Sequence, residues 1–266
     1  RNAMRNPRRT SATASALLVG VGVVVVFTVF AASIKTYLTG TIDRTFGSDL
    51  VVSAPAFGGA GIDPSLAPAI AELPEVADSV GLGTGAAVIE GDERGVRYGD
   101  PGPLSQIIDL DVTEGSLGEL ADDQVAVSAD AAEDEGWRLG SPLTVEFIDG
   151  STERFTVGAI YEEDTLIGNL FVPRAAWVPH APQAMDNAVY VSLAPGVDLE
   201  AGKAAIQPVV DRFDGPDVQD RDEYAADQTA GLDMMLGVIY VLLALAILIA
   251  LVGIANTLSL SIHERR

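Results

Sequence analysis

The 266-residue sequence contains no cysteine, only two histidines and few aromatic residues. The absence of cysteine excludes disulfide bonds, thiolate metal sites and thiol nucleophiles. Basic residues are scarce too, because 16 Lys and Arg stand against 38 Asp and Glu, for a net charge of −22. A surface this acidic repels nucleic acid and anionic lipid head groups, so we expect no nucleic-acid partner. The more general explanation of the acidic charge is that it keeps the protein soluble.

Two long stretches lack charged side chains altogether. In the first, Ala16–Ala32, Thr28 is the only polar side chain; the second, Met234–Ile262, lies between Asp233 and His263. A helix crosses the hydrocarbon of a bilayer with about 20 apolar residues. Each run therefore predicts a transmembrane helix.

Charge on either side of these runs predicts their orientation. Four arginines precede the first run, two arginines close the chain, and nearly all of the acidic residues lie between the runs. Since Lys and Arg concentrate on the cytoplasmic side of a membrane, both ends are predicted to be cytoplasmic and the middle extracytoplasmic. The sequence thus predicts a multi-pass plasma-membrane protein with an acidic exterior domain.

A cleavable signal peptide is the alternative interpretation of the first run. Its apolar core is longer than the roughly 7–15 residues that such peptides contain, which favours a retained helix. The sequence starts with Arg1 rather than Met. We expect the chain to be part of a longer one.

The segment between the runs predicts an α+β extracytoplasmic domain. One strand–helix–strand unit is expected over Asp49–Ile89. A second consists of a strand at Asn187–Leu193, a helix at Asp198–Phe213 and a short strand around Val218. Proline lacks a backbone donor, so Pro208 should kink or split that helix. We expect the two units to pack together beside the membrane.

A β-rich inserted subdomain is predicted between the two units. Gln124–Ser128 is expected to be a strand, and Ala129–Leu139 a short helix capped by Gly140. Asp149 and Gly150 form a dipeptide that is typical of a tight β-hairpin. Short strands at this spacing are typical of a small barrel or sandwich.

These elements divide the chain into four parts. They are the cytoplasmic N-terminus with the first transmembrane helix (1–36), a membrane-proximal α+β part (37–105 and 176–222), the inserted subdomain (106–175), and a stalk with the second transmembrane helix and cytoplasmic end (223–266).

Glycine-rich segments in the chain do not predict nucleotide binding. Gly81–Ala86 resembles a dinucleotide fingerprint, but that motif needs a helix directly after it to receive the pyrophosphate. Here Glu90 and Gly91 follow too soon, so a loop or bulge is predicted. Gly202 and Lys203 lack the partners of a phosphate-binding loop. The chain is therefore not expected to bind ATP by that route.

The sequence signals for a catalytic or metal-binding site are also weak. Two acidic clusters offer oxygen ligands for calcium without the ordered spacing of a calcium loop, and they are predicted to be solvated surface: Asp109, Asp111 and Glu114, and Glu162, Glu163 and Asp164. His180 and His263 stand alone in the sequence, whereas a hydrolytic triad needs a positioned nucleophile and acid. Trp137 and Trp177 are expected to be core or interface residues. We expect a non-catalytic chain with no bound cofactor or metal.

The second apolar run carries a stripe of small residues that predicts helix packing. The stripe consists of Ala246, Ala250, Gly253 and Thr257, which recur on one helix face. Asn256 lies beside it and would need a polar partner in lipid. A hairpin with the first run, using Gly20 and Gly22, is the simpler explanation. We expect the stripe to contact further helices outside this chain.

Several segments together resemble a known family. Asn6–Thr10 leads into a small and apolar stretch, and Ile249–Arg265 closes the second run. Gly140–Val145 and Phe155–Ile160 lie in the middle of the chain. These segments resemble permease subunits of ABC transporters of the FtsX-like, MacB-like kind and their extracytoplasmic core domain.

The resemblance implies a set of partners and a role. It implies a separate cytoplasmic ABC ATPase, with Glu264 and Arg265 beginning the segment that contacts it. It also implies a second permease half or copy, surrounding membrane lipid, an extracytoplasmic protein partner in some cases, and long helices that relay nucleotide-driven motion outward.

A two-span membrane receptor or scaffold is the alternative function. A chain-length regulator would need long heptad helices outside the membrane, and the sequence shows none. A sensor should continue beyond Arg266 into a signalling helix and a catalytic domain. Cargo is not specified by the sequence.

Overall fold

The structure is a computed structural model, and it describes residues 18, 21–34, 36, 40, 47–54, 61–162, 166–181, 183–213 and 218–263. In the last of these segments the side chains of residues 228–233, 246, 249–251 and 253–263 are not described. The chain divides into two compact units, one formed by Arg1–Thr39 with Ala225–Arg266 and the other by Gly40–Tyr224.

The larger unit mixes strands and helices. Its strands are β1 (Leu50–Ser53), β2 (Val76–Ile89), β3 (Asp92–Gly99), β4 (Val112–Gly115), β5 (Gln124–Ser128), β6 (Pro142–Glu146), β7 (Thr152–Tyr161), β8 (Leu170–Pro173), β9 (Asp186–Leu193) and β10 (Val218–Asp220). Its helices are α2 (Leu66–Ala71), α3 (Pro101–Ile107), α4 (Ala129–Glu135), α5 (Arg174–Trp177), the 3₁₀ turn η2 (Val178–His180) and α6 (Leu199–Arg212). The predicted α+β class is confirmed.

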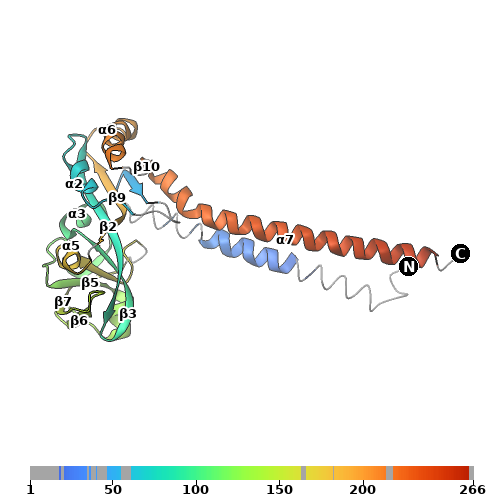
Figure 1. Cartoon of the computed structure of the whole chain (residues 1–266), viewed down its shortest axis with the longest axis horizontal. Coiled ribbons are helices and arrows are strands. Elements are labelled where there is room, and N and C mark those ends of the chain that lie inside the picture. The colour runs from blue at the N-terminus through green and yellow to red at the C-terminus, as the bar shows by residue number, and fades with distance from the viewer. Residues whose placement is uncertain are drawn as a thin grey trace. The chain divides into compact units, whose positions relative to one another are not determined.

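One sheet contains all ten strands of the described residues. Its order is β10-β1-β9-β2-β3-β8-β5-β7-β4, and β6 pairs with both β2 and β7. The 14-residue strand β2 connects the two ends, because its first half pairs with β9 and its second half with β3 (Figure 1). Most pairs are antiparallel, and β3–β8 and β5–β7 are parallel.

Two hydrophobic cores lie along this sheet. The first is built from β1, β9, β10, α2 and α6, with Leu50, Ile70 and Ile206 fully buried. The second is built from β3 and the strands β5 to β8 together with the end of β2, and it contains both tryptophans. Residues from β2 belong to both clusters. The four predicted domain boundaries stay a prediction.

Local signals explain most element ends. The predicted hairpin at Asp149 and Gly150 is confirmed, since β6 and β7 pair in antiparallel register across it. The prediction that α4 reaches Leu139 is wrong, because Gly136 ends the helix in the left-handed conformation at φ 71°. α6 continues through Pro208 without splitting.

The glycine-rich segment Gly81–Ala86 is part of β2. The prediction was a loop or bulge; no loop is present, and the pairing of β2 with β9 shifts register between Leu82 and Gly83. Strands β3 and β4 were not predicted. β3 is rich in charged residues, and all four residues of β4 are exposed, so neither shows a hydrophobic pattern.

The smaller unit is helical where it is described. Residues 21–34 form helix, and the 43-residue helix α7 (Arg221–His263) starts in the larger unit and belongs to the smaller one from Ala225 onward. Thr28 Oγ1 and Tyr240 Oη lie 3.0 Å apart in this unit. Among the described residues, no helix is both long enough and apolar enough to cross a membrane. Part of the first predicted span lies outside those residues, and many side chains of the second are not described.

Candidate functional site

Three alternate glycines on β2 form a strip against which large side chains pack. Residues two apart in a strand point to the same face, and Gly81, Gly83 and Gly85 occupy such positions. A Cβ at Gly83 would lie 2.0 Å from the Cζ of Tyr98, and one at Gly85 would lie 2.0 Å from a ring carbon of Trp177. The glycines therefore allow the two aromatic rings to contact the strand backbone.

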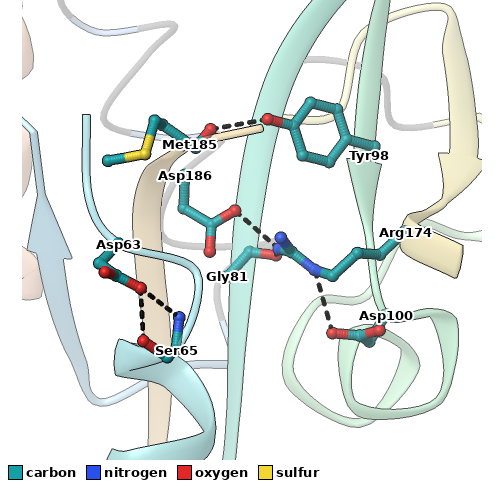
Figure 2. A network of polar contacts seen from close by, with 8 residues as sticks. All are labelled: Asp63, Ser65, Gly81, Tyr98, Asp100, Arg174, Met185 and Asp186. Atoms are coloured by element: carbon teal, nitrogen blue, oxygen red, sulfur yellow. Dashed lines mark hydrogen bonds and ion pairs between the residues drawn. The ribbon is translucent and has the colours of Figure 1, made fainter. Parts of the chain in front are cut away.

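A buried ion pair lies at the first glycine of this strip (Figure 2). Arg174 at the start of α5 donates from its Nη2 to Asp186 Oδ1 at 2.6 Å and to the carbonyl of Gly81 at 2.7 Å. Its Nε lies 3.3 Å from Asp100, the residue before α3. The guanidinium also lies over the ring of Tyr98. One side chain thus connects β2, β9 and the start of α3.

Burial controls the electrostatics of this site. The side chain of Asp186 is fully buried, and desolvation raises its pKa, although the Arg174 guanidinium acts in the opposite direction. Asp100 and Asp63 raise the pKa of Asp186 further by charge repulsion. Asp186 Oδ2 and Arg174 Nη1 are buried without a hydrogen-bond partner among the described residues. Burial and the two nearby carboxylates therefore oppose ionisation of Asp186, while the Arg174 guanidinium favours it.

Tyr98 closes the site on the side of β3. Its hydroxyl donates to the carbonyl of Met185 at 2.7 Å (Figure 2), and burial raises the pKa of Tyr98. Its ring stacks on Trp177 with 5.3 Å between centroids. A cavity of about 310 Å³ lies beside it, lined in part by Thr84, Met185 and Asp186. The arrangement fixes the junction between the two halves of the sheet.

His180 does not stand alone, contrary to the sequence prediction. Its Nδ1 lies 2.8 Å from Ser151 Oγ and 3.0 Å from Asp149 Oδ2, and its ring stacks on Phe147. Ser151 also donates to Asp149 at 2.5 Å. Ser151 and Asp149 share Nδ1, and on the opposite side of the ring Glu153 Oε1 lies 3.3 Å from Nε2, so the imidazole bridges three side chains of the hairpin. It fastens the β6–β7 hairpin to η2.

The hydrogen bonds around Asp149 have an electrostatic effect. Side-chain and backbone hydrogen bonds from Ser151, followed by the one from His180, lower the pKa of Asp149 to about 2. Asp149 therefore stays ionised in acid. Its carboxylate holds the turn together over a wide pH range.

The start of α7 is anchored by a capping box that sequence reasoning missed. Glu223 N donates to Asp220 Oδ1 and Asp220 N donates to Glu223 Oε2, both at 2.9 Å, which is the reciprocal pattern of that motif. Lys203 of α6 donates to both carboxylates, at 2.9 and 2.6 Å. The Asp-x-x-Glu spacing was a readable signal. It fixes where the long helix begins.

A buried tyrosine pair adds to this anchor. The hydroxyls of Tyr190 on β9 and Tyr224 in the first turn of α7 lie 3.4 Å apart, and their rings meet edge to face. Burial raises the pKa of Tyr190 well above its ordinary value. The first turn of α7 therefore belongs to the larger unit.

The predicted helix-packing residues are only partly described. Gly22 is helical, and a Cβ there would meet no described atom within 4 Å. The small-residue stripe and the neighbouring Asn256 lie in α7, but none of their side chains is among those described: Ala246, Ala250, Gly253, Thr257 and Asn256. Gly20, Glu264 and Arg265 lie outside the described residues. The Thr28–Tyr240 contact was missed, although Thr28 is the one polar side chain of its run.

The predicted acidic clusters lie on the surface where they are described. Asp109, Asp111 and Glu114 are exposed, and Glu163 and Asp164 lie outside the described residues. Among described residues, no group of three or more acidic or histidine side chains is placed to hold a metal ion.

Comparisons with known proteins identify relatives of the chain. A family model described as MacB-like periplasmic core domain matches residues 10–209. No curated protein matches the sequence. Among solved structures, the periplasmic region of MacB from Actinobacillus actinomycetemcomitans is similar, with a TM-score of 0.52 and 13% identity over 67% of this chain and 92% of that chain.

A second solved structure has a lower TM-score. It is the extracellular domain of the noncanonic ABC-type transporter YknZ from Gram-positive bacteria, with a TM-score of 0.48 and 12% identity over 65% of this chain and 98% of that chain. At these identities the MacB structure shows a shared fold.

Proposed function

This chain belongs to the family of MacB-like periplasmic core domains, the extracellular domain of MacB/FtsX-type ABC transporter permeases, and on that premise we propose that it relays ATPase-driven conformational change across a membrane. The relay serves export, extraction or signalling and not conduction through a simple channel. ATP is hydrolysed on a separate cytoplasmic subunit, and this chain contributes no catalytic group.

In this role the chain lies in the plasma membrane. The uncharged runs Ala16–Ala32 and Met234–Ile262 act as its membrane spans, with the acidic larger unit outside and both ends in the cytoplasm. Glu264 and Arg265 begin the contact with the ATPase. A second permease half or copy pairs with the spans, and an extracytoplasmic protein is a further partner.

The observation that carries this proposal is the anchoring of α7. Its first turn is bonded to β9 and α6 through Tyr224 and Glu223, and the helix then continues without interruption to His263. A continuous helix transmits axial displacement and rotation because its backbone hydrogen bonds hold each turn to the next. Movement at the far end would therefore reach the sheet through its strand β9.

The test breaks α7 without changing its register. Replacing Thr229 by Gly together with Ala230 by Pro removes a backbone donor inside the helix, at a cost of about 3 kcal/mol or more. Thr229→Ala is the matched control, since it keeps the helix. In proteoliposomes holding the chain with its ABC ATPase, spin labels on β1 and β5 report the nucleotide-dependent motion of the larger unit.

The two variants give opposite expectations. The control should keep both nucleotide-dependent label distances and stimulation of the ATPase, whereas the Gly-Pro variant should lose the distance change while still binding the ATPase. Equal distance changes in both variants would contradict the relay. Failure of any cytoplasmic ABC ATPase to bind the wild-type chain would instead favour the two-span receptor or scaffold.

A further inference from the structure

Strand β4 forms one edge of the ten-stranded sheet. It pairs with β7 and, in the part of the chain that the structure describes, with no other strand. An edge strand presents unpaired backbone N–H and C=O groups that another strand can join. All four residues of β4 are exposed, which leaves the edge open to a partner.

Two cavities flank this edge strand. Val112 and Gly115 line a cavity of about 630 Å³, and Thr113 and Glu114 line another of about 400 Å³. Successive side chains of an added strand would point to opposite faces of the sheet. A segment laid along β4 would therefore place side chains toward both cavities, although the register of β4 against β7 shifts between Val112 and Glu114.

Both cavities combine apolar walls with acidic rims. Apolar side chains in the first are Ile107, Ile108, Leu110 and Leu117, and those in the second are Trp137 and Ile160. Asp109 and Glu119 line the first cavity, and Glu114, Glu133 and Glu162 line the second, where Arg138 is the one cation among the lining residues. Lys and Arg match such walls, because their stems pack on apolar surface while their charged ends meet carboxylates.

Exposed apolar side chains at this edge support a protein occupant. Val112 is 37% exposed and Leu139 is 48% exposed. Leu139 packs beside Gly115, since a Cβ on that glycine would lie 2.8 Å from its Cδ1. Exposed apolar surface rimmed by charge is typical of a protein contact.

We propose that β4 is a docking edge that takes an extended, basic segment of a partner protein as an added strand. A second copy of this chain is disfavoured because its net charge of −22 would bring like charge to the acidic rims. Anionic lipid is disfavoured for the same reason. The docking edge goes beyond the proposed relay and does not depend on it, because binding requires no nucleotide.

Three labelled peptides test the proposal on the full 266-residue chain. TKVRVKT can pair as a basic strand, TKPRPKT keeps its charge but loses strand donors to proline, and TEVEVET reverses the charge. TKVRVKT should bind most tightly by fluorescence anisotropy and slow amide exchange within Leu110–Ser116. TKPRPKT should bind about tenfold more weakly, since two backbone hydrogen bonds are lost at about 0.5–1.5 kcal/mol each.

Matched charge reversals separate the docking edge from general attraction. Glu114→Lys with Glu162→Lys should weaken TKVRVKT binding about tenfold. Glu72→Lys with Glu93→Lys makes the same change in net charge at exposed positions elsewhere and should leave binding within about twofold. Equal binding of TKVRVKT and TKPRPKT, equal effects of the two double variants, or unchanged exchange at β4 would overturn the proposal.

Discussion

The ring of Tyr98 lies directly on the backbone of Gly83, across the pair formed by β3 and β2. On either side of this contact, the Asp186 carboxylate packs against Gly81 and the Trp177 ring packs against Gly85. The strip therefore joins the aromatic contacts of the second core to the buried ion pair. It accounts for three glycines in a strand, where glycine otherwise weakens the structure.

Replacing Gly83 by Ala should destabilise the larger unit by about 2–3 kcal/mol, because the new methyl group overlaps the Tyr98 ring. Gly95→Ala on β3 is the control, since a Cβ there meets nothing within 4 Å, and it should change stability by less than about 0.5 kcal/mol. Tryptophan fluorescence during urea unfolding measures both, because Trp137 and Trp177 belong to the second core. Equal effects would refute the close approach.

Arg174→Met should destabilise the chain by about 3–5 kcal/mol at neutral pH, because it leaves the Asp186 carboxylate buried and unpaired. Arg154→Met removes an exposed arginine from β7 and should cost less than about 0.5 kcal/mol. Urea midpoints of the two variants give the comparison. A loss at Arg174 no larger than that at Arg154 would show that the pair is not structural.

The loss of stability caused by Arg174→Met, called the deficit below, should also depend on pH. Without Arg174, burial raises the pKa of Asp186 still further above the model-peptide value of 3.8. A raised folded-state pKa favours the folded state below the unfolded value, and this contribution is lost as pH rises through the folded pKa. The deficit should therefore shrink from pH 7 toward pH 4, and a constant deficit would contradict the assignment.

Asp149→Asn should flatten the acid limb of the stability profile. The pKa of Asp149 is lowered from 3.8 to about 2, so its contribution is present above 3.8 and is lost as pH falls through about 2. The variant should lose less stability than the wild type in that window. Ser151→Ala, which removes the largest single cause of the shift, should reproduce part of the effect in thermal unfolding scans.

Asp220→Ala should loosen the first turn of α7. It removes the cap and one partner of Lys203, and losing a helix cap costs about 1 kcal/mol. Hydrogen exchange of the amides in Arg221–Tyr224 should accelerate. Asp227→Ala, in the same helix about one turn further on, should leave that exchange unchanged; a similar acceleration would mean that the capping box does not hold the turn.

Much of the fold could be predicted from local signals. The hairpin at Asp149 and Gly150, the strands with alternating apolar residues and the Asp198 cap region of α6 all follow from short-range chemistry. The single sheet could not be predicted, because it depends on β2 pairing with strands far along the chain. β4 escaped prediction because an exposed edge strand has no buried face to produce a pattern.

The ion pair of the candidate site could not be predicted from the sequence for a different reason. Arg174 and Asp186 are twelve residues apart, and only the register of β2 and β9 brings them onto Gly81. The alternate glycines were visible in the sequence, and a spacing of two is typical of close approach in a strand.

Single cysteines test the central claim most directly, because the 266-residue sequence has none. Glu72→Cys and Asp122→Cys place thiols at exposed positions of the larger unit, and Arg266→Cys places one at the predicted cytoplasmic end. A membrane-impermeant maleimide applied to intact cells should label the first two and should reach the third after permeabilisation. Labelling of Arg266→Cys in intact cells, with Glu72→Cys and Asp122→Cys protected until permeabilisation, would contradict an extracytoplasmic domain of a transporter permease.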